Sequence, residues 1–171
     1  MQHGNMCVIR RGSGLDILTP RGQRTLQDEK KAAARFCAVH PGLSYIHTKK
    51  HKPVGLDAFI VKDDEIIAAV ECKCRYDVTL EEFCSAYHSE WLVTFDKLVT
   101  ARALAMAFHV PLYGFVYLVN SDRLLVQQLT HIDGEWLCDM KIMRTVTQRT
   151  VNGGTATRAN AFVCMRGAKE I

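Results

Sequence analysis

Two acidic residues and a lysine stand at a spacing that could support hydrolysis of a phosphodiester bond. Asp57 is followed fourteen residues later by Glu71, and Lys73 comes two residues after Glu71. Carboxylate oxygens are ligands that Mg²⁺ and Mn²⁺ prefer. A lysine beside such an ion can orient water or stabilise negative charge in a transition state. These residue types therefore predict metal-dependent phosphoryl chemistry, with Asp57, Glu71 and Lys73 as catalytic residues.

The segments that carry these residues have the pattern of paired strands. The apolar run 66–70 predicts a buried strand that ends in Glu71 and Lys73. Since side chains alternate across a strand, Glu71 and Lys73 should share one face, and Cys72 should point to the other. A preceding strand over 56–61, joined through a turn at 63–64, would bring Asp57 beside Glu71. We expect a metal held by Asp57 and Glu71, with the backbone carbonyl of Cys72 as a further ligand.

Lys73 would lie close to both acids in this arrangement. Two neighbouring carboxylates should favour its ammonium form. We therefore expect Lys73 to orient water or stabilise charge rather than act only as a base.

The remaining pattern predicts an α/β fold with an αβββαβ core, a mixed central sheet flanked by helices, and extra C-terminal β-strands. Helices are expected near 23–39 and 91–109, with a short helix or lid at 80–86. The Asn-Gly-Gly run at 152–154 is a hairpin signal. The expected strands cover 43–47, 56–61, 65–74, 112–119, 123–129, 141–150 and 155–165. We expect one domain over 1–171, with a flexible basic arm at 1–21, a core at 23–130 and a C-terminal β extension at 131–171.

Asp57 and the Glu71-Cys72-Lys73 run resemble the D-x(n)-E-x-K signature of the PD-(D/E)XK nuclease superfamily, and the element order over 23–130 is similar to its core. The proline of the family name is absent, because Leu56 precedes Asp57. The resemblance implies that Asp57 and Glu71 bind Mg²⁺, which Mn²⁺ can replace, and that Lys73 is the catalytic lysine. It also implies an acidic residue from the first helix, for which Glu29 is the first candidate and Asp28 the second. Within the superfamily the chain looks most like Holliday junction resolvases and phage or repair nucleases.

The charge distribution favours a nucleic-acid partner, with DNA preferred. Residues 1–52 hold ten Lys and Arg against three Asp and Glu, whereas the rest of the chain is net acidic. The late arginines could extend a binding surface or form the contacts of a homodimer. The residues expected to contact phosphates are Lys49, Lys50, Lys52, Arg35 and Lys97, with Arg102 as a further candidate. The late arginines are Arg144, Arg149, Arg158 and Arg166.

Composition excludes several other classes. Seven scattered cysteines without a CxxC pair argue against a disulfide framework and against a zinc finger. No run approaches the ~20 apolar residues of a membrane span, and the first residues do not resemble a signal peptide. We therefore expect a soluble, cytoplasmic protein without a membrane partner.

Three functions remain open. The first is a DNA endonuclease, with structured DNA such as junctions as one substrate. The second is a DNA exonuclease of the same fold. The third is a nucleic-acid-binding module that keeps the fold without the chemistry, in which Glu71 and Lys73 simply form an ion pair.

Overall fold

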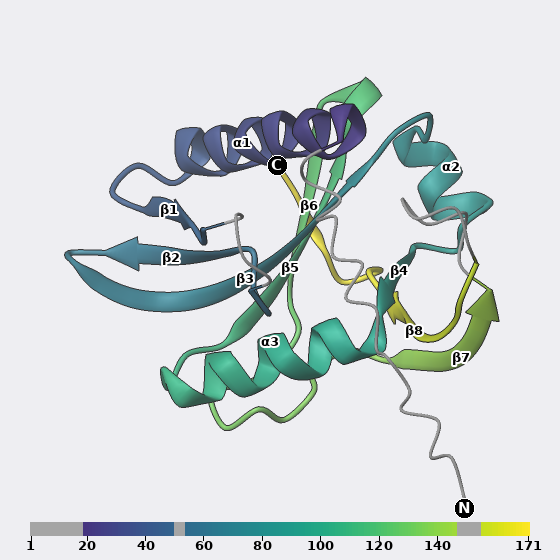
Figure 1. Ribbon diagram of the computed structural model, residues 1–171. Helices are drawn as coiled ribbons and strands as arrows, with labels where there is room; N and C mark the ends of the chain where they lie inside the picture. Colours follow the sequence, from purple (N-terminus) through teal and green to yellow (C-terminus); the bar gives the residue numbers. More distant parts are fainter. Residues whose placement is uncertain (1–18, 50–53, 147–154) are drawn as a thin grey trace, which may run out of the picture.

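The structure is a computed structural model that describes residues 19–49, 54–146 and 155–171. In this part of the chain, helices and strands alternate along the sequence before a run of strands at the end (Figure 1). The elements are α1 (Pro20–Val39), β1 (Ser44–His47), β2 (Ala58–Lys62), β3 (Glu65–Arg75), α2 (Leu80–Ser85), β4 (Glu90–Thr94), α3 (Phe95–Ala107), β5 (Leu112–Leu118), the 3₁₀ turn η2 (Val119–Ser121), β6 (Arg123–Gln128), β7 (Met140–Val146), β8 (Thr157–Cys164) and β9 (Lys169–Glu170).

The strands form two sheets. The larger sheet has the order β1-β2-β3-β5-β6-β9, and only its β3–β5 pair is parallel. The smaller sheet has the order β4-β8-β7 and is antiparallel. The expected α/β fold with a mixed sheet and additional C-terminal strands is therefore confirmed.

One helix covers each face of the larger sheet, with α1 on one side and α3 on the other (Figure 1). Phe36 of α1 packs in a buried cluster with Val70 and Cys72 of β3. Leu98 of α3 packs in a second cluster with Ala69, which precedes Val70 and points to the opposite face of β3. The alternation expected for this strand is thus observed, and Glu71 belongs to the face that α3 covers.

The first helix begins earlier than expected. Pro20 occupies its first turn, and the Thr19 hydroxyl accepts a hydrogen bond from the Gly22 N–H at 3.0 Å. Proline at the start and threonine as N-cap suit a helix N-terminus, because neither requires an intrahelical N–H bond there. The arm expected over 1–21 is therefore wrong at its end, since residues 20 and 21 are helical. Residues 1–18 lie outside the described part.

The helix expected over 91–109 is wrong in its first residues. Glu90–Thr94 is strand β4, in which Trp91 and Val93 are buried and their neighbours are partly exposed. This strand pairs with β8, so Trp91 lies opposite Val163. The helix α3 starts only at Phe95. The late hairpin is observed as the β7–β8 pair, although its expected turn at 152–154 lies outside the described residues.

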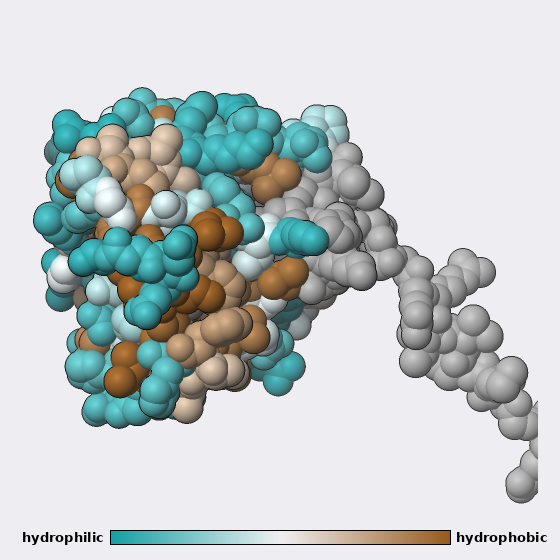
Figure 2. Space-filling model, turned by 90° about the vertical axis from the view of Figure 1, so that its left-hand side faces the viewer, coloured by the Kyte–Doolittle hydropathy of each residue, from teal (hydrophilic) through white to brown (hydrophobic). Residues whose placement is uncertain are grey.

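The side of the molecule that carries β1 and β2 shows apolar patches interleaved with hydrophilic side chains (Figure 2). Several large apolar side chains of the described residues are about half exposed, among them Val39, Ile46 and Phe108. Across the described ranges, no helix has the length and apolar character needed to cross a bilayer.

Candidate active site

The β2–β3 hairpin brings Asp57 next to residues 70–72 of β3. Ala58 lies opposite Val70, and the Asp57 N–H donates to the Val70 carbonyl at 3.1 Å. The Asp57 carboxylate then accepts a hydrogen bond from the Cys72 N–H, with 3.0 Å between Oδ2 and N. Antiparallel pairing of β2 and β3 therefore brings Asp57 close to Glu71, fourteen residues later in the chain, as the sequence predicts.

The segment before Asp57 is held between β1 and α3. The Thr48 hydroxyl donates to the Leu56 carbonyl at 2.6 Å, and the Thr48 N–H donates to the Asp57 carbonyl at 3.0 Å. Gly55 lies so close to α3 that an added Cβ would stand 2.1 Å from the Thr100 Cγ2 atom. Only glycine fits at position 55 without displacing Thr100. The segment that carries Asp57 can therefore lie close to the helix.

Helix α3 supplies a lysine that contacts both acids. The Lys97 Nζ atom lies 3.2 Å from Asp57 Oδ2 and also donates to Glu71 Oε1. The side chains of Asp57 and Glu71 are only 8% and 2% exposed, whereas that of Lys97 is 41% exposed. Lys97 was expected to contact phosphate, but the structure places its ammonium group between the two carboxylates.

Among the described residues, one ammonium group, that of Lys97, contacts both carboxylates of this cluster. Burial penalises the charged form of a carboxylate. Burial and then the charge of Asp57 raise the pKa of Glu71 to about 8, despite the opposing effect of Lys97. Burial lowers the pKa of Lys97, but the two carboxylates outweigh burial and hold its pKa above the ordinary value. The cluster therefore favours an additional positive charge.

Lys73 lies on the same face of β3 as Glu71 and is exposed. Burial of part of the side chain, followed by the positive charges of Arg75 and Lys97, lowers its pKa; the nearby Glu71 opposes this shift. Glu71 therefore favours the ammonium form as expected, but burial and the two neighbouring cations together outweigh it. The catalytic role expected for Lys73 stays a prediction. An exposed amine with a lowered pKa can exchange a proton with solvent more readily than an ordinary lysine.

The acidic residues of α1 are both buried. Asp28 accepts hydrogen bonds from Lys31 at 2.8 Å and from the Tyr76 hydroxyl at 2.9 Å. Glu29 lies within electrostatic range of Tyr45, whose pKa is raised by burial and then by Cys72, Asp57, Glu29 and Glu71. The Asp28 carboxylate is thus hydrogen-bonded to neighbours on the α1 side of the sheet. A catalytic role for Glu29 stays a prediction.

Asp57 and Glu71 fit a divalent cation. The Glu71 Oε2 atom is buried and has no hydrogen-bond partner in the described part of the chain, so this oxygen is available as a ligand. Within residues 19–49, 54–146 and 155–171, no three His, Cys, Asp or Glu side chains are grouped to hold a metal. An ion at this pair would therefore draw its remaining ligands from peptide groups, water or substrate, as Mg²⁺ commonly does. The role expected for the Cys72 carbonyl stays a prediction.

The expected phosphate contacts lie in different environments. Lys49 is exposed after β1, while Lys50 and Lys52 lie outside the described residues. Arg35 instead donates from Nε to the Ile171 carbonyl and from a terminal nitrogen to Asp122, both at 2.7 Å. Arg102 donates to the Gly134 carbonyl at 2.6 Å and lies over the Trp136 ring. The two arginines therefore join elements of the fold, and only Lys97 among the described candidates contacts the acidic pair.

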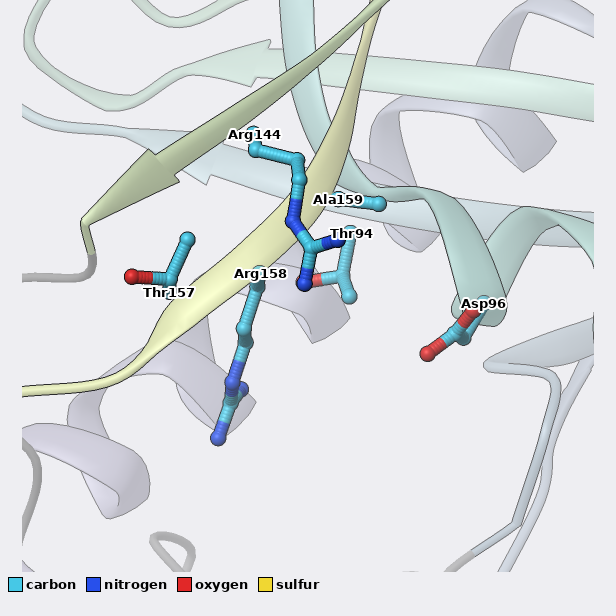
Figure 3. Close-up of a pocket in the computed structure, with 6 residues that line it drawn as sticks. All are labelled: Thr94, Asp96, Arg144, Thr157, Arg158 and Ala159. Atoms are coloured by element: carbon cyan, nitrogen blue, oxygen red, sulfur yellow. The ribbon is translucent and has the colours of Figure 1, made fainter.

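A pocket beside the start of α3 is lined by residues that the sequence did not indicate as one site. It has a volume of about 430 Å³, and strands β4, β7 and β8 contribute to its lining (Figure 3). The only sequence signal for it was the positive charge of the late strands, which include Arg144 and Arg158. Its lining residues are Thr94, Asp96, Arg144, Thr157, Arg158 and Ala159.

Comparison with known proteins gives no relative for this chain. No protein-family model matches it, and neither the curated proteins nor the solved structures contain a match.

Proposed function

We propose that the protein is a metal-dependent nuclease that hydrolyses phosphodiester bonds in DNA, with Asp57 and Glu71 as its metal-binding acids. The observation that carries this proposal is the pair of buried carboxylates of Asp57, just before β2, and Glu71, within β3. Lys97 contacts both of them, and the Glu71 Oε2 atom has no hydrogen-bond partner in the described chain. Such a pair is costly in a fold unless further positive charge reaches it.

Each residue of the site would have a separate role. A divalent ion, when bound, would polarise the phosphoryl group and offset the negative charge that develops during hydrolysis. Asp57 and Glu71 would hold that ion, and the Cys72 N–H fixes the orientation of the Asp57 carboxylate. Lys73, exposed on the same face, would orient the attacking water through Nζ and exchange a proton with it. Lys97 would keep the carboxylates apart from bulk water until the ion and substrate arrive.

A second candidate function is a DNA-binding module without catalysis. The contacts of Lys97 favour it, because one lysine that bonds to both carboxylates can complete a purely structural ion cluster. In that case the acids would stabilise the packing of α3 on the β2–β3 hairpin, and no metal would be required.

Cleavage of a substrate panel separates the two functions. The panel would contain supercoiled plasmid, linear duplex, single strands, a flap and a four-way junction, each in Mg²⁺, Mn²⁺ and EDTA. Asp57→Asn and Lys73→Ala should each lower metal-dependent cleavage by at least ~10²-fold. Lys62→Ala, which removes an exposed lysine from the end of β2, is the matched control and should cleave like the wild type.

The outcomes assign the function. Cutting of closed circles supports an endonuclease, whereas cutting of linear duplex alone supports an exonuclease. Equal activity in Asp57→Asn and wild type would show that the observed cleavage does not come from this site. DNA binding without cleavage, together with a melting temperature that Mg²⁺ leaves unchanged, would establish the non-catalytic module.

A further inference from the structure

The pocket beside α3 is lined by two guanidinium groups from neighbouring strands. In the β7–β8 pair Arg144 lies opposite Ala159, and Arg158 lies opposite Thr145. Arg144 reaches across β8 towards Thr94, while Arg158 extends from β8 into the open space below it (Figure 3). Both arginines are exposed. Two fixed strands therefore present two positive groups to one cavity.

Within the described residues, neither guanidinium group is paired with an acidic side chain. Among the described residues no hydrogen bond or ion pair joins Arg144 or Arg158 to another side chain, and Asp96 on the opposite wall pairs with neither. This differs from Arg35 and Arg123, each of which pairs with an acidic residue. The planar donors of an arginine match the oxygens of a phosphate group. The charge of the pocket is thus available to an anion from outside.

Two hydroxyl groups complete the polar lining. Thr94 precedes α3 as its N-cap residue, but its side chain makes no capping hydrogen bond. Thr157 stands on β8 next to Arg158. A volume of about 430 Å³ lies within the range of ~300–1,000 Å³ that is common for ligand sites. The cavity can therefore hold a phosphate together with its sugar rather than a small inorganic ion alone.

The pocket and the acidic pair share the first turn of α3. Asp96 lines the pocket, and the next residue, Lys97, contacts Asp57 and Glu71. Consecutive residues lie about 3.8 Å apart at Cα, so the two places are neighbours on one helix.

We propose that Arg144 and Arg158 form a subsite for the phosphodiester backbone of the nucleic acid that the acidic pair would cleave. The identity of this ligand rests on the proposed function, whereas the anion-binding property rests on the pocket itself. Phosphate contacts of this kind position a strand without reading its sequence.

Binding in EDTA tests the subsite independently of cleavage. The full chain would be titrated against labelled duplex DNA, single-stranded DNA and an acidic peptide, with fluorescence anisotropy as the readout, from about 50 to about 200 mM salt. The double variant Arg144→Ala/Arg158→Ala should bind DNA roughly ten-fold more weakly, and its salt slope should fall by about one for each arginine. Asp96→Asn should strengthen binding by about two- to five-fold, because it removes a negative charge from the wall. Lys62→Ala is the control with one positive charge less elsewhere.

Each result decides the proposal. Weaker DNA binding in the arginine variant, with a reduced salt slope and a normal melting temperature, supports the subsite even if no cleavage is ever observed. Unchanged affinity and slope in that variant overturn the subsite, even if Asp57→Asn abolishes cleavage. Tighter binding of the acidic peptide than of DNA would overturn the assignment to a phosphodiester backbone.

Discussion

Two charged clusters adjoin the first turn of α3, and they differ in whether their charges are paired inside the fold. Asp57, Glu71 and Lys97 are joined to one another, and both carboxylates are buried. Arg144 and Arg158 are exposed and have no partner among the described residues. Buried charges must be compensated inside the fold because desolvation is costly, whereas exposed charges are screened by water and can remain open to a ligand. We therefore expect the first cluster to affect both stability and function, and the second to affect binding alone.

The pH dependence of stability should give the largest effect. The folded-state pKa of Glu71, about 8, lies above its ordinary value of 4.5. The folded protein therefore holds this proton more tightly, so the stabilisation is complete below about pH 4.5 and is lost as pH rises through about 8. The loss should be on the order of several kcal/mol. Glu71→Gln should flatten this part of the curve, as measured by urea unfolding at pH 5 to pH 9. Parallel curves for the two proteins would contradict the pKa of Glu71.

Removal of the shared ammonium group should give the next largest effect. Lys97→Met keeps the aliphatic stem but removes the ammonium group that contacts both buried carboxylates. The free energy of unfolding at pH 9 should fall by about 1–3 kcal/mol. Mg²⁺ should restore part of this loss if the carboxylates bind the ion. Lys62→Met serves as the control, and an equal loss in both variants would show that the carboxylates do not depend on Lys97.

A smaller effect should follow from filling the space at Gly55. The added methyl group of Gly55→Ala would collide with the Thr100 Cγ2 atom and press the Asp57 segment away from α3. Overpacking of this kind costs at least about 1 kcal/mol. Thr100→Ser removes the atom that collides, so the double variant should recover most of the stability in thermal unfolding. If the double variant is as unstable as Gly55→Ala, the collision with Thr100 is not the cause of the lost stability.

The smallest effect is expected at the exposed cluster. Arg144→Ala and Arg158→Ala should each change the free energy of unfolding by less than about 0.5 kcal/mol, because neither side chain has a partner to lose among the described residues. Chemical denaturation of the two variants checks this value. A loss of more than about 1 kcal/mol would mean that these arginines stabilise the fold, and the contrast between the two clusters would then disappear.

The hairpin that carries the acids could be predicted because its signals are local. Alternation around Glu71 and the turn at Asp63 and Asp64 lie within one short stretch of sequence, and the structure has that hairpin. The order of the elements and the mixed sheet followed from the same kind of periodicity. The acids Asp57 and Glu71 were therefore found from the sequence together with the face on which Glu71 lies.

The partners of these residues depended on packing between distant segments. The run from Trp91 to Thr94 was assigned to a helix, but pairing with β8, about 70 residues further along the chain, makes it a strand. The contact of Lys97 with the acids depends on where that strand ends and on how α3 rotates over the sheet. Arg144 and Thr94 line the same pocket only when β7, β8 and β4 are assembled into one sheet. Their placement therefore also depends on packing between distant segments.

The pairing of β4 with β8 also has a consequence for the order in which the protein folds. The β2–β3 hairpin joins neighbouring segments, whereas β4 and β8 are separated by most of the C-terminal half of the chain. Closing a long loop costs more chain entropy and slows the contact that depends on it. The acidic residues should therefore come together early in folding, and the arginine pocket should form only after the second sheet has closed. Pulsed hydrogen exchange during refolding would then protect the amides of β3 before those of β8.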